Sequence, residues 1–358
     1  MRVVFRADSS REIGSGHIVR DMTLAEVLRG GGAQVIFVCR AHDGALLELL
    51  AQRQFTVLAL PLRLREARYD GPYGHWLGAP QQQDARDTID ALVASSLPHC
   101  DWMVVDHYGI DRTWETILEP VAERIMVIDD LADRKHHCNL LLDQNLVAGF
   151  RDRYRGLVAR DTVQLLGPQY AVLHPQYAAL RLAKMQHTRL KNVLAYFGAS
   201  DPYNLTGMTI RSFAALPDRE LTLSVVVGNI NPYEAEILEL AGNDSRIRVY
   251  PPLPSLAELL AQADICVGAG GATTWERLCL QVPSLVYALA DNQVAVSEHL
   301  DQLGAIRFMG HARNASVTDL SDALLQALSR DWTPQWEGVE VDGLGAPRVA
   351  TRMLQNHP

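Results

Sequence analysis

Residues 264–278 read DICVGAGGATTWERL, and this stretch joins an apolar strand to a glycine-rich turn and the start of a helix. Gly268, Gly270 and Gly271 let the backbone approach a bound group closely. The helix that follows presents unpaired N–H groups and a partial positive charge, which suit an anion such as a diphosphate. The stretch therefore predicts an α/β fold with an anion-binding loop at the carboxyl end of a strand.

Glu276 lies about one and a half turns into the predicted helix. A carboxylate in this place can accept two hydrogen bonds from the cis-diol of a ribose. The alternative is a solvent-exposed helix glutamate, which is the commoner place for this residue type. We favour nucleotide binding and expect Gly270, Gly271, Thr273 and Glu276 to contact the substrate.

A second glycine-rich junction lies near the beginning of the chain, where Gly14-Ser15-Gly16-His17 follows the predicted strand Arg2–Arg6. A histidine at the start of a helix can take a proton from water or from a hydroxyl group. The helix N-terminus also disfavours the cationic imidazole and so keeps a base available. The alternative is a tight turn with a helix-capping histidine. The nearby Arg6, Asp8 and Arg20 are candidates either for ion pairs or for substrate contacts.

Apolar runs alternate with helical patterns along the whole chain, which predicts mainly parallel sheets covered on both faces. Ile18, Val19, Met22, Ala25 and Leu28 show one such helical spacing, and Gly30-Gly31-Gly32 ends that helix. The expected strands of the first half are Arg2–Arg6, Gln34–Arg40, Thr56–Leu60, Trp102–His107, Arg124–Asp129 and Asn139–Asp143. Those of the second half are Asn192–Phe197, Thr222–Val227, Arg246–Tyr250, Asp264–Val267, Ser284–Leu289 and Ala305–Met309.

The alternation of predicted strands and helices is interrupted once, in a basic stretch over residues 178–191. We therefore predict two Rossmann-like α/β domains, at residues 1–177 and 192–342, with a linker or connecting helix at 178–191 and a helical tail at 343–358. Two such domains imply a central cleft with ligand loops at the carboxyl ends of the strands.

Polar residues follow three other predicted strands and are further candidates for the site. They are Asp106-His107-Tyr108-Gly109, the loop Phe197-Gly198-Ala199-Ser200-Asp201-Pro202, and Asp291-Asn292-Gln293. The alternatives are a satisfied network at a strand end for the first and a helix N-cap for the last. Asp129-Asp130 and Asp133-Arg134 can either order neighbouring loops or bind a sugar, and we favour the structural role. His136-His137-Cys138 does not favour a metal site, because adjacent residues on an extended chain point to opposite faces.

The composition is that of an ordinary globular protein, with 48% hydrophobic and 21% charged residues among 358. A formal net charge of −9 argues against general binding of nucleic acid or anionic lipid. The five cysteines are widely spaced and form no CxxC, so neither disulfides nor a thiolate metal site is indicated. No signal peptide and no apolar run of about 20 residues is present. We expect a cytoplasmic monomer that needs no metal and no other cofactor.

Together, the motifs resemble the UDP-sugar hydrolases of pseudaminic acid biosynthesis, a GT-B family related to the GlcNAc transferase that forms lipid II. The resemblance covers most of the chain and rests on RADSSREIGSGHIVRDMTLA (6–25), VVDHYGID (104–111), IDDLADR (128–134), LLLDQN (140–145), LLGPQYAVLHPQY (165–177), FGASDPYN (197–204), VGAGGATTWERL (267–278) and DNQ (291–293). The GSGH and DHYG elements favour the hydrolases over other GT-B transferases. The resemblance implies release of UDP from UDP-2,4-diacetamido-2,4,6-trideoxy-β-L-altropyranose.

The resemblance also implies roles for individual residues. It makes His17 the general base and gives Tyr108 and Asn292 supporting catalytic roles. It assigns ribose binding to Glu276 and diphosphate contacts to Gly270, Gly271 and the adjacent backbone. We add Gly14, Gly16, Arg20, Asp106, Ser200 and Thr273 as substrate-binding candidates. The sequence departs from the family pattern at Ala199, Asp21, His174 and Gln281, where glycine, cysteine, arginine and glycine are usual.

The expected reaction is attack of water on the anomeric carbon, with inversion and with His17 as the base. A UDP-sugar glycosyltransferase, in which His17 would deprotonate an acceptor hydroxyl group, is the main alternative, because the fold does not separate the two reactions. A UDP-sugar-binding protein without catalytic activity is a third possibility.

Overall fold

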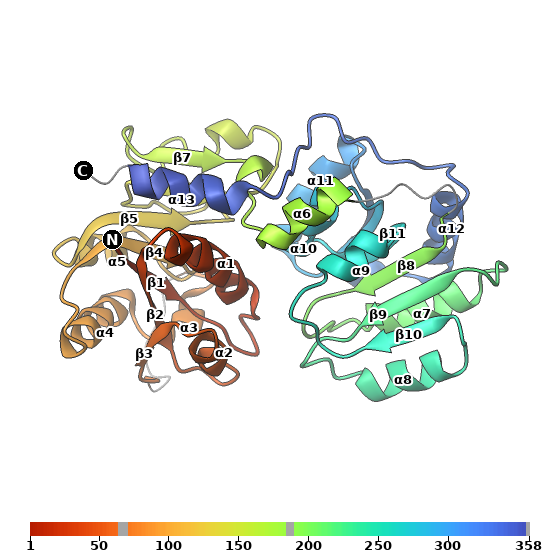
Figure 1. The fold of residues 1–358 in the computed structure, drawn as a ribbon, viewed down its shortest axis with the longest axis horizontal. Helices are drawn as coiled ribbons and strands as arrows, with labels where there is room; N and C mark the ends of the chain where they lie inside the picture. Colours follow the sequence, from red (N-terminus) through yellow and green to blue (C-terminus); the bar gives the residue numbers. More distant parts are fainter. Residues whose placement is uncertain (64–70, 184–189, 356–358) are drawn as a thin grey trace. The chain divides into compact units, whose positions relative to one another are not determined.

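A computed structural model describes residues 1–63, 71–183 and 190–355, which form two compact α/β units (Figure 1). Unit 1 comprises Met1–Asn145, Gly149–Val172 and Gly345–Pro358, and unit 2 comprises Leu146–Ala148 and Leu173–Leu344. Each unit has its own parallel sheet and its own hydrophobic core. The two Rossmann-like domains predicted from the sequence are therefore confirmed.

The sheet of unit 1 has seven parallel strands in the order β3-β2-β1-β4-β5-β6-β7. Their bounds are β1 Arg2–Ala7, β2 Gln34–Arg40, β3 Thr56–Leu60, β4 Cys100–Asp106, β5 Ala122–Ile128, β6 Leu140–Asp143 and β7 Val163–Leu166. The strand order reverses between β1 and β4, and side-chain groups at the carboxyl ends of these two strands lie next to each other. In such sheets this reversal is the usual place for a ligand.

Helices connect the strands of unit 1 and cover its sheet. They are α1 Gly16–Gly30, α2 Leu47–Gln52, α3 Gly74–Leu77, α4 Gln81–Ala94, α5 Arg112–Leu118 and α13 Gly345–Gln355, with short 3-10 turns η1 Phe150–Asp152 and η2 Pro168–Tyr170. Helix α1 ends at the predicted glycine run, where Gly32 has a φ of +88°. A residue with a side chain is strained in that conformation, so the run ends the helix.

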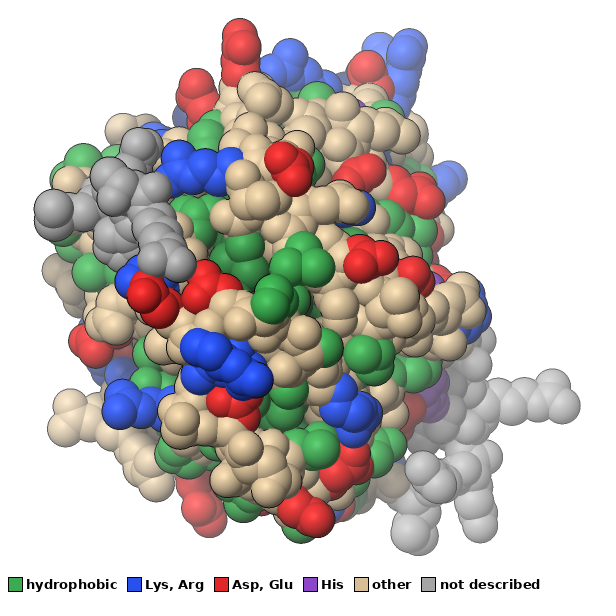
Figure 2. Space-filling view, turned by 90° about the vertical axis from the view of Figure 1, so that its right-hand side faces the viewer, with side chains coloured by type: hydrophobic (Ala, Val, Ile, Leu, Met, Phe, Trp, Pro, Cys, Tyr) green, Lys and Arg blue, Asp and Glu red, His purple; other side chains and the backbone are tan. Residues whose placement is uncertain are grey.

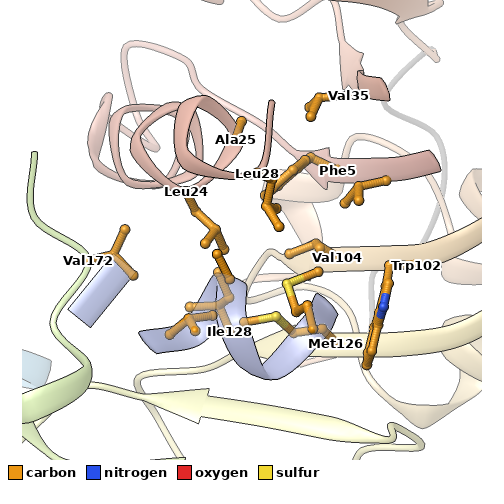
Figure 3. Packing of buried hydrophobic residues seen from close by; sticks show 14 of the residues in the cluster. Phe5, Leu24, Ala25, Leu28, Val35, Trp102, Val104, Met126, Ile128 and Val172 are labelled. Atoms are coloured by element: carbon orange, nitrogen blue, oxygen red, sulfur yellow. The ribbon is translucent and has the colours of Figure 1, made fainter. Parts of the chain in front are cut away.

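One hydrophobic cluster of unit 1 joins α1, the sheet and the last helix of the chain. Leu24, Ala25 and Leu28 of α1 are fully buried and lie next to Phe5 and Val104 of the sheet (Figure 3). The buried residues of α13, namely Ala346, Val349, Ala350 and Met353, belong to the same cluster. Helix α13 thus completes a core that begins with the first strand.

The sheet of unit 2 has six parallel strands in the order β10-β9-β8-β11-β12-β13, with a reversal between β8 and β11. The strands are β8 Asn192–Tyr196, β9 Thr222–Val226, β10 Ile247–Tyr250, β11 Ile265–Ala269, β12 Ser284–Ala288 and β13 Arg307–His311. The helices are α6 Pro175–Ala183, α7 Leu205–Ala214, α8 Glu234–Gly242, α9 Ala257–Gln262, α10 Thr273–Cys279, α11 Val294–Gln302 and α12 Val317–Leu328, with 3-10 turns η3 Asp291–Gln293 and η4 Ala312–Asn314.

All twelve predicted strands are present, shifted by two residues or fewer at each end. One strand, β7, is not among the predicted ones. Its sequence VQLL is only four residues long and half-buried at the edge of the sheet, so it lacks the long apolar run that marks the other strands.

The bounds of the two units differ from those expected from the sequence, because unit 1 includes Gly345–Pro358, while unit 2 includes Leu146–Ala148 and begins at Leu173. The predicted linker at 178–191 begins within α6, and its residues 184–189 lie outside the described part of the chain.

The outer surface mixes charges of both signs. Figure 2 shows acidic and basic side chains interspersed over one face. Among the helices of the described residues, none combines the length and the apolar character that a membrane span requires.

Candidate active site

The first candidate site lies at the carboxyl ends of β1 and β4. Helix α1 begins at Gly16, and His17 is its second residue. The preceding Gly14 has a φ of +81°, and its N–H donates to the carbonyl oxygen of Ser10 at 2.9 Å, which closes the turn before the helix. Ser15 makes no side-chain capping hydrogen bond and the first turn holds no acidic residue, so the positive end of the helix dipole is not neutralised locally.

His17 and Asp106 form a hydrogen-bonded pair. The imidazole Nδ1 lies 2.7 Å from Oδ1 of Asp106, the last residue of β4. Asp106 is fully buried, whereas the side chain of His17 is 10% exposed. An ionised carboxylate can only accept, so Nδ1 carries the proton and Nε2 is left with a free lone pair. The pair therefore holds the imidazole in the tautomer that a general base requires.

Arg20 lies one turn after His17 and fixes Asp106 from the other side. Its Nη2 and Nε donate to the two oxygens of Asp106 at 2.7 and 3.0 Å, and its Nη1 donates to both oxygens of Asp130 at 3.1 and 3.0 Å. Burial alone would raise the pKa of Asp106, but the charge of Arg20 and the hydrogen bonds from Arg20 and His17 hold it well below its usual range. Asp106 is therefore ionised over the whole physiological range.

Tyr108 packs against the base rather than presenting a free hydroxyl group. Its ring meets the imidazole of His17 edge-on, with centroids 4.7 Å apart, and its hydroxyl donates to Oδ2 of Asp130 at 3.0 Å. Burial, followed by the charge of Asp130, raises the pKa of Tyr108 well above its usual range. Tyr108 is thus a neutral side chain that restrains the imidazole.

Two further aromatic residues join this cluster and were not predicted from the sequence. Trp76 stacks on Tyr108 with an interplanar angle of 22°, and Tyr73 meets Tyr108 edge-on at 5.2 Å. The indole Nε1 of Trp76 donates to Oε1 of Glu12 at 3.3 Å, which connects α3 to the loop before His17. Trp76 lies on the short helix α3 and Tyr73 immediately precedes it, and no motif marks either residue in the sequence.

A buried ionic network lies beside the site, and it shows that Arg6 and Asp8 are structural residues. Arg6 is fully buried, donates to both oxygens of Asp84 at 3.0 and 2.7 Å, and pairs with Asp8 at 2.7 Å. Oδ2 of Asp8 faces Nε2 of His42 and of His107 at 3.7 and 3.5 Å. In the same network Arg40 pairs with Asp84 and Asp87, and the indole of Trp114 donates to Asp84.

His107 cannot use Nε2 as a metal ligand in this arrangement. Its Nδ1 lies 2.9 Å from the N–H of Gly109 and must accept that hydrogen bond, so the ring proton is on Nε2. Burial lowers the pKa of His107 to about 3, so this ring is neutral. His136 and His137 pair with Glu115 and Glu119 at 2.7 and 2.6 Å. Within residues 1–63, 71–183 and 190–355, no group of three or more His, Cys, Asp or Glu side chains is arranged to hold a metal ion.

The glycine loop of unit 2 is tightly packed on one side. A Cβ at Gly270 would lie 2.7 Å from Oγ of Ser297, and a Cβ at Gly268 would lie 2.9 Å from the carbonyl oxygen of Tyr196. At Gly271 the nearest atom would be 3.8 Å away. The loop thus needs glycine at 268 and 270 for packing, while its face at Gly271 is open to the approach of another group.

Hydrogen bonds from Arg277 connect the end of β11 to the first residues of α10. Arg277 is buried, and its Nη2 donates to the carbonyl oxygen of Ala269 at 2.8 Å and to the hydroxyl of Thr274 at 2.9 Å. Its Nη1 donates to the hydroxyl of Thr273 at 3.1 Å. The Thr273 hydroxyl therefore keeps its own proton for another acceptor.

Glu276 is not the solvent-exposed glutamate of the alternative interpretation. Its Oε2 is buried and has no partner at normal hydrogen-bond geometry among the described residues, while the neighbouring hydroxyl of Tyr177 opposes the effect of burial on its pKa. Burial raises the pKa of Glu276, and its charge helps to raise the pKa of Tyr196 to about 12. A buried carboxylate oxygen without a donor costs free energy unless a bound group supplies one.

Ser200 and Asn292 lie on loops at the same carboxyl edge of the sheet, after β8 and β12. Asn292 is exposed within η3, and Ser200 is half-buried. Asp201, next to Ser200, accepts from the N–H groups of Leu205 and Thr206 at 2.9 and 2.8 Å. The carboxylate of Asp201 therefore already occupies donors at the N-terminus of α7, so an anion would compete with it there.

The predicted site residues fall into two groups, one in each unit. In unit 1 the structure brings together His17, Arg20, Asp106 and Tyr108, with Gly14 and Gly16 in the adjoining turn. In unit 2 Gly270, Gly271, Thr273 and Glu276 lie on one loop and helix. Asp130 was not among the residues predicted for the site. It connects Arg20 to Tyr108 and also accepts a hydrogen bond from Asn145 at 3.1 Å.

The chain is similar to three curated proteins. It is 24% identical to the UDP-2,4-diacetamido-2,4,6-trideoxy-β-L-altropyranose hydrolase of Campylobacter jejuni, over 85% of this chain and 97% of that protein. It is 27% identical to the spore coat polysaccharide biosynthesis protein SpsG of Bacillus subtilis, over 87% of this chain and 84% of that protein. An uncharacterized protein of Methanocaldococcus jannaschii is 22% identical over 80% of this chain, which spans 55% of the length of that relative. No family model matches the sequence.

Solved structures share the fold over nearly the whole chain. MurG of Acinetobacter baumannii superimposes with a TM-score of 0.66 at 13% identity, covering 99% of both chains. The UDP-GlcNAc 2-epimerase of Neisseria meningitidis superimposes with a TM-score of 0.61 at 12% identity, covering 99% of this chain and 100% of that one. The chain therefore has a GT-B-like fold of two Rossmann-like domains, and its sequence is similar to a UDP-sugar hydrolase of the family that its motifs resemble.

Proposed function

We propose that this protein hydrolyses UDP-2,4-diacetamido-2,4,6-trideoxy-β-L-altropyranose to UDP and the free sugar. The observation that carries the proposal is the pair formed by His17 and Asp106 at the start of α1. The name of the Campylobacter relative supports the choice of substrate, and the Bacillus relative supports a role in polysaccharide or sugar biosynthesis.

In the proposed reaction, Nε2 of His17 takes a proton from a water molecule while the water oxygen attacks the anomeric carbon. The bond between that carbon and the diphosphate oxygen breaks, and UDP leaves with the electron pair. Asp106 stabilises the imidazolium that forms, because it is ionised and hydrogen-bonded to Nδ1. Arg20 and Tyr108 hold Asp106 and the imidazole in place, which keeps Nε2 directed outward. A single displacement of this kind inverts the configuration at the anomeric carbon.

We further propose that unit 2 binds the nucleotide. Backbone N–H groups around Gly271 and the hydroxyl of Thr273 would donate to the diphosphate, whose charge grows as the bond breaks. The ribose diol would donate to Glu276, whose buried Oε2 has no partner at normal hydrogen-bond geometry among the described residues. Asn292 and Ser200 would contact the sugar or the phosphates from neighbouring loops.

The decisive experiment is incubation with the UDP-sugar in ¹⁸O-labelled water without any acceptor. We expect UDP and free sugar, with the label in the anomeric hydroxyl group and none in UDP. Label on the phosphate would show attack at phosphorus and would refute the mechanism. Release of UDP only after addition of an acceptor would instead indicate a glycosyltransferase, in which His17 deprotonates an acceptor hydroxyl group. Tight binding of UDP without turnover in either arm would indicate a binding protein.

A further inference from the structure

Asp21 is a carboxyl group in a place where the chain otherwise buries apolar side chains. It lies one turn after His17 on the inward face of α1. The same face carries Ile18, Leu24 and Leu28, which belong to the hydrophobic core. Its relative exposure is 0%. Burying a carboxylate costs several kcal/mol unless donors or opposite charges compensate it.

Asp21 lacks the partners that an ionised carboxylate needs. No N–H or O–H of the described residues donates to either of its oxygens. Arg20, the neighbouring cation, already makes two hydrogen bonds to Asp106 and two to Asp130. An ionised Asp21 would therefore place three carboxylates around one guanidinium in a buried cluster.

The carboxyl group of Asp106 is close enough to that of Asp21 to form a hydrogen bond when one of the two carries a proton. Two carboxyl groups in contact are stable when they share one proton, because one then donates to the other. Asp106 is the member that stays ionised, since it accepts from both Arg20 and His17. The proton therefore belongs on Asp21.

We infer that Asp21 is a positioning residue that remains a neutral acid at neutral pH and donates its O–H to Asp106. Asp106 then receives donors from three sides, namely His17, Arg20 and Asp21, and its carboxylate plane is fixed relative to the imidazole. The neutral donor adds rigidity without a second negative charge, which would otherwise hold the proton on His17 too firmly for release after turnover. The catalytic part of this inference rests on the proposed role of His17 as the base.

The electrostatic surroundings agree with this protonation state. Burial, followed by the charge of Asp106, raises the pKa of Asp21 well above its usual range, while Arg20 opposes the shift. A further neighbour is Cys39 of β2, a buried thiol whose own pKa is raised by burial and by the charge of Asp8. Cys39 is thus neutral and offers no charge that would stabilise an ionised Asp21.

The first test measures the proton directly and needs no substrate. Infrared absorption of the wild-type protein at pH 7 is compared with that of Asp21→Asn in the region of the un-ionised carboxyl C=O stretch. Asp143 and Glu276, whose pKa values burial also raises, contribute to this absorption in both proteins, so we expect one further component in the wild type that is missing from the variant. Asp21→Cys, another neutral donor, serves as the second reference in case Asp21→Asn does not fold. A wild-type absorption equal to that of the variant in this region refutes the inference whether or not the protein is a hydrolase.

The second test asks what the donor does for the reaction. Asp21→Asn keeps a neutral N–H donor of the same size, so we expect its kcat to stay within about 3-fold of the wild type, whereas Asp21→Ala should lose about 3- to 10-fold in kcat with little change in KM. The pH at which activity falls on the acidic side should be the same for wild type and Asp21→Asn. A loss in Asp21→Asn as large as that in Asp21→Ala would show that a carboxylate is required and would refute the neutral-donor role.

Discussion

His17 and Asp106 are 89 residues apart in the sequence, and a single hydrogen bond of 2.7 Å joins them. Each was predicted separately, because glycine and polar residues at the ends of apolar strands are recognisable patterns. Their pairing was not predicted, since it depends on β1 and β4 being neighbours in the sheet. The same holds for Asp130, whose contact with Arg20 arises only after β5 joins the sheet.

Replacing His17 tests the base. We expect His17→Asn to lower kcat by about 10²-fold or more, the range typical of losing a general base. The affinity for UDP should change little, because the groups proposed to hold the nucleotide belong to unit 2. Turnover is followed by UDP release and affinity by calorimetry. His99→Asn, an exposed histidine in the same unit, is the matched control. Activity near the wild-type level in His17→Asn would remove His17 from the mechanism.

Replacing Glu276 tests the ribose contact. We expect Glu276→Ala to weaken UDP binding by about 1.5–3 kcal/mol, the usual value of hydrogen bonds to a charged group. Calorimetric titration with UDP measures this directly. Glu298→Ala on α11 is the control, because Glu298 is exposed. If a folded Glu276→Ala variant binds UDP as the wild type does, the buried carboxylate has only a structural role.

At the scale of elements, the sequence predicted long apolar strands well because both faces of a parallel sheet are buried. It failed for β7, a half-buried edge strand, and for α3, whose four residues carry too little periodicity to be recognised. Trp76 was missed for that reason. The glycine loop after β11 was recognised from its residues, but which of its glycines are sterically required was not apparent before the neighbouring atoms were known.

Gly270 and Gly271 form a matched pair for testing the loop. An added Cβ at Gly270 would lie 2.7 Å from Oγ of Ser297, whereas at Gly271 the nearest atom would be 3.8 Å away. We therefore expect Gly270→Ala to lower the free energy of unfolding by about 1–3 kcal/mol, and Gly271→Ala to leave it within about 0.5 kcal/mol of the wild type. Urea unfolding measures both. Equal destabilisation of the two variants would contradict the packing argument.

At the scale of the whole molecule, buried carboxyl groups make stability depend on pH. Asp143, at the end of β6, contacts Arg153 at 2.5 Å and the hydroxyl of Tyr154 at 3.1 Å. Burial nevertheless raises its pKa from 3.8 to about 7, with a further contribution from Asp130. Between about pH 4 and pH 7 the native state then holds more protons than the unfolded chain, so stability falls as the pH rises.

Asp143→Asn should remove this dependence, because an amide does not ionise. We expect the variant to gain stability relative to the wild type between pH 4.5 and pH 8, by at most about 4 kcal/mol, the value of a shift of roughly three pKa units. Thermal unfolding at both pH values is the measurement, with the exposed Asp161→Asn as the control. An unchanged difference between variant and wild type across this range would show that Asp143 is ionised throughout.

Because α13 packs into the core of unit 1, it affects when this core can be completed during synthesis. Strand β1 and helix α1 are synthesised before unit 2, whereas Ala346, Val349, Ala350 and Met353 of the same cluster follow it. The buried face of α1 therefore stays uncovered by α13 throughout synthesis, whereas unit 2, nearly continuous from Leu173 to Leu344, can close its own core beforehand. His17, the proposed base, therefore lies on a helix whose core cluster is complete only once α13 has been made.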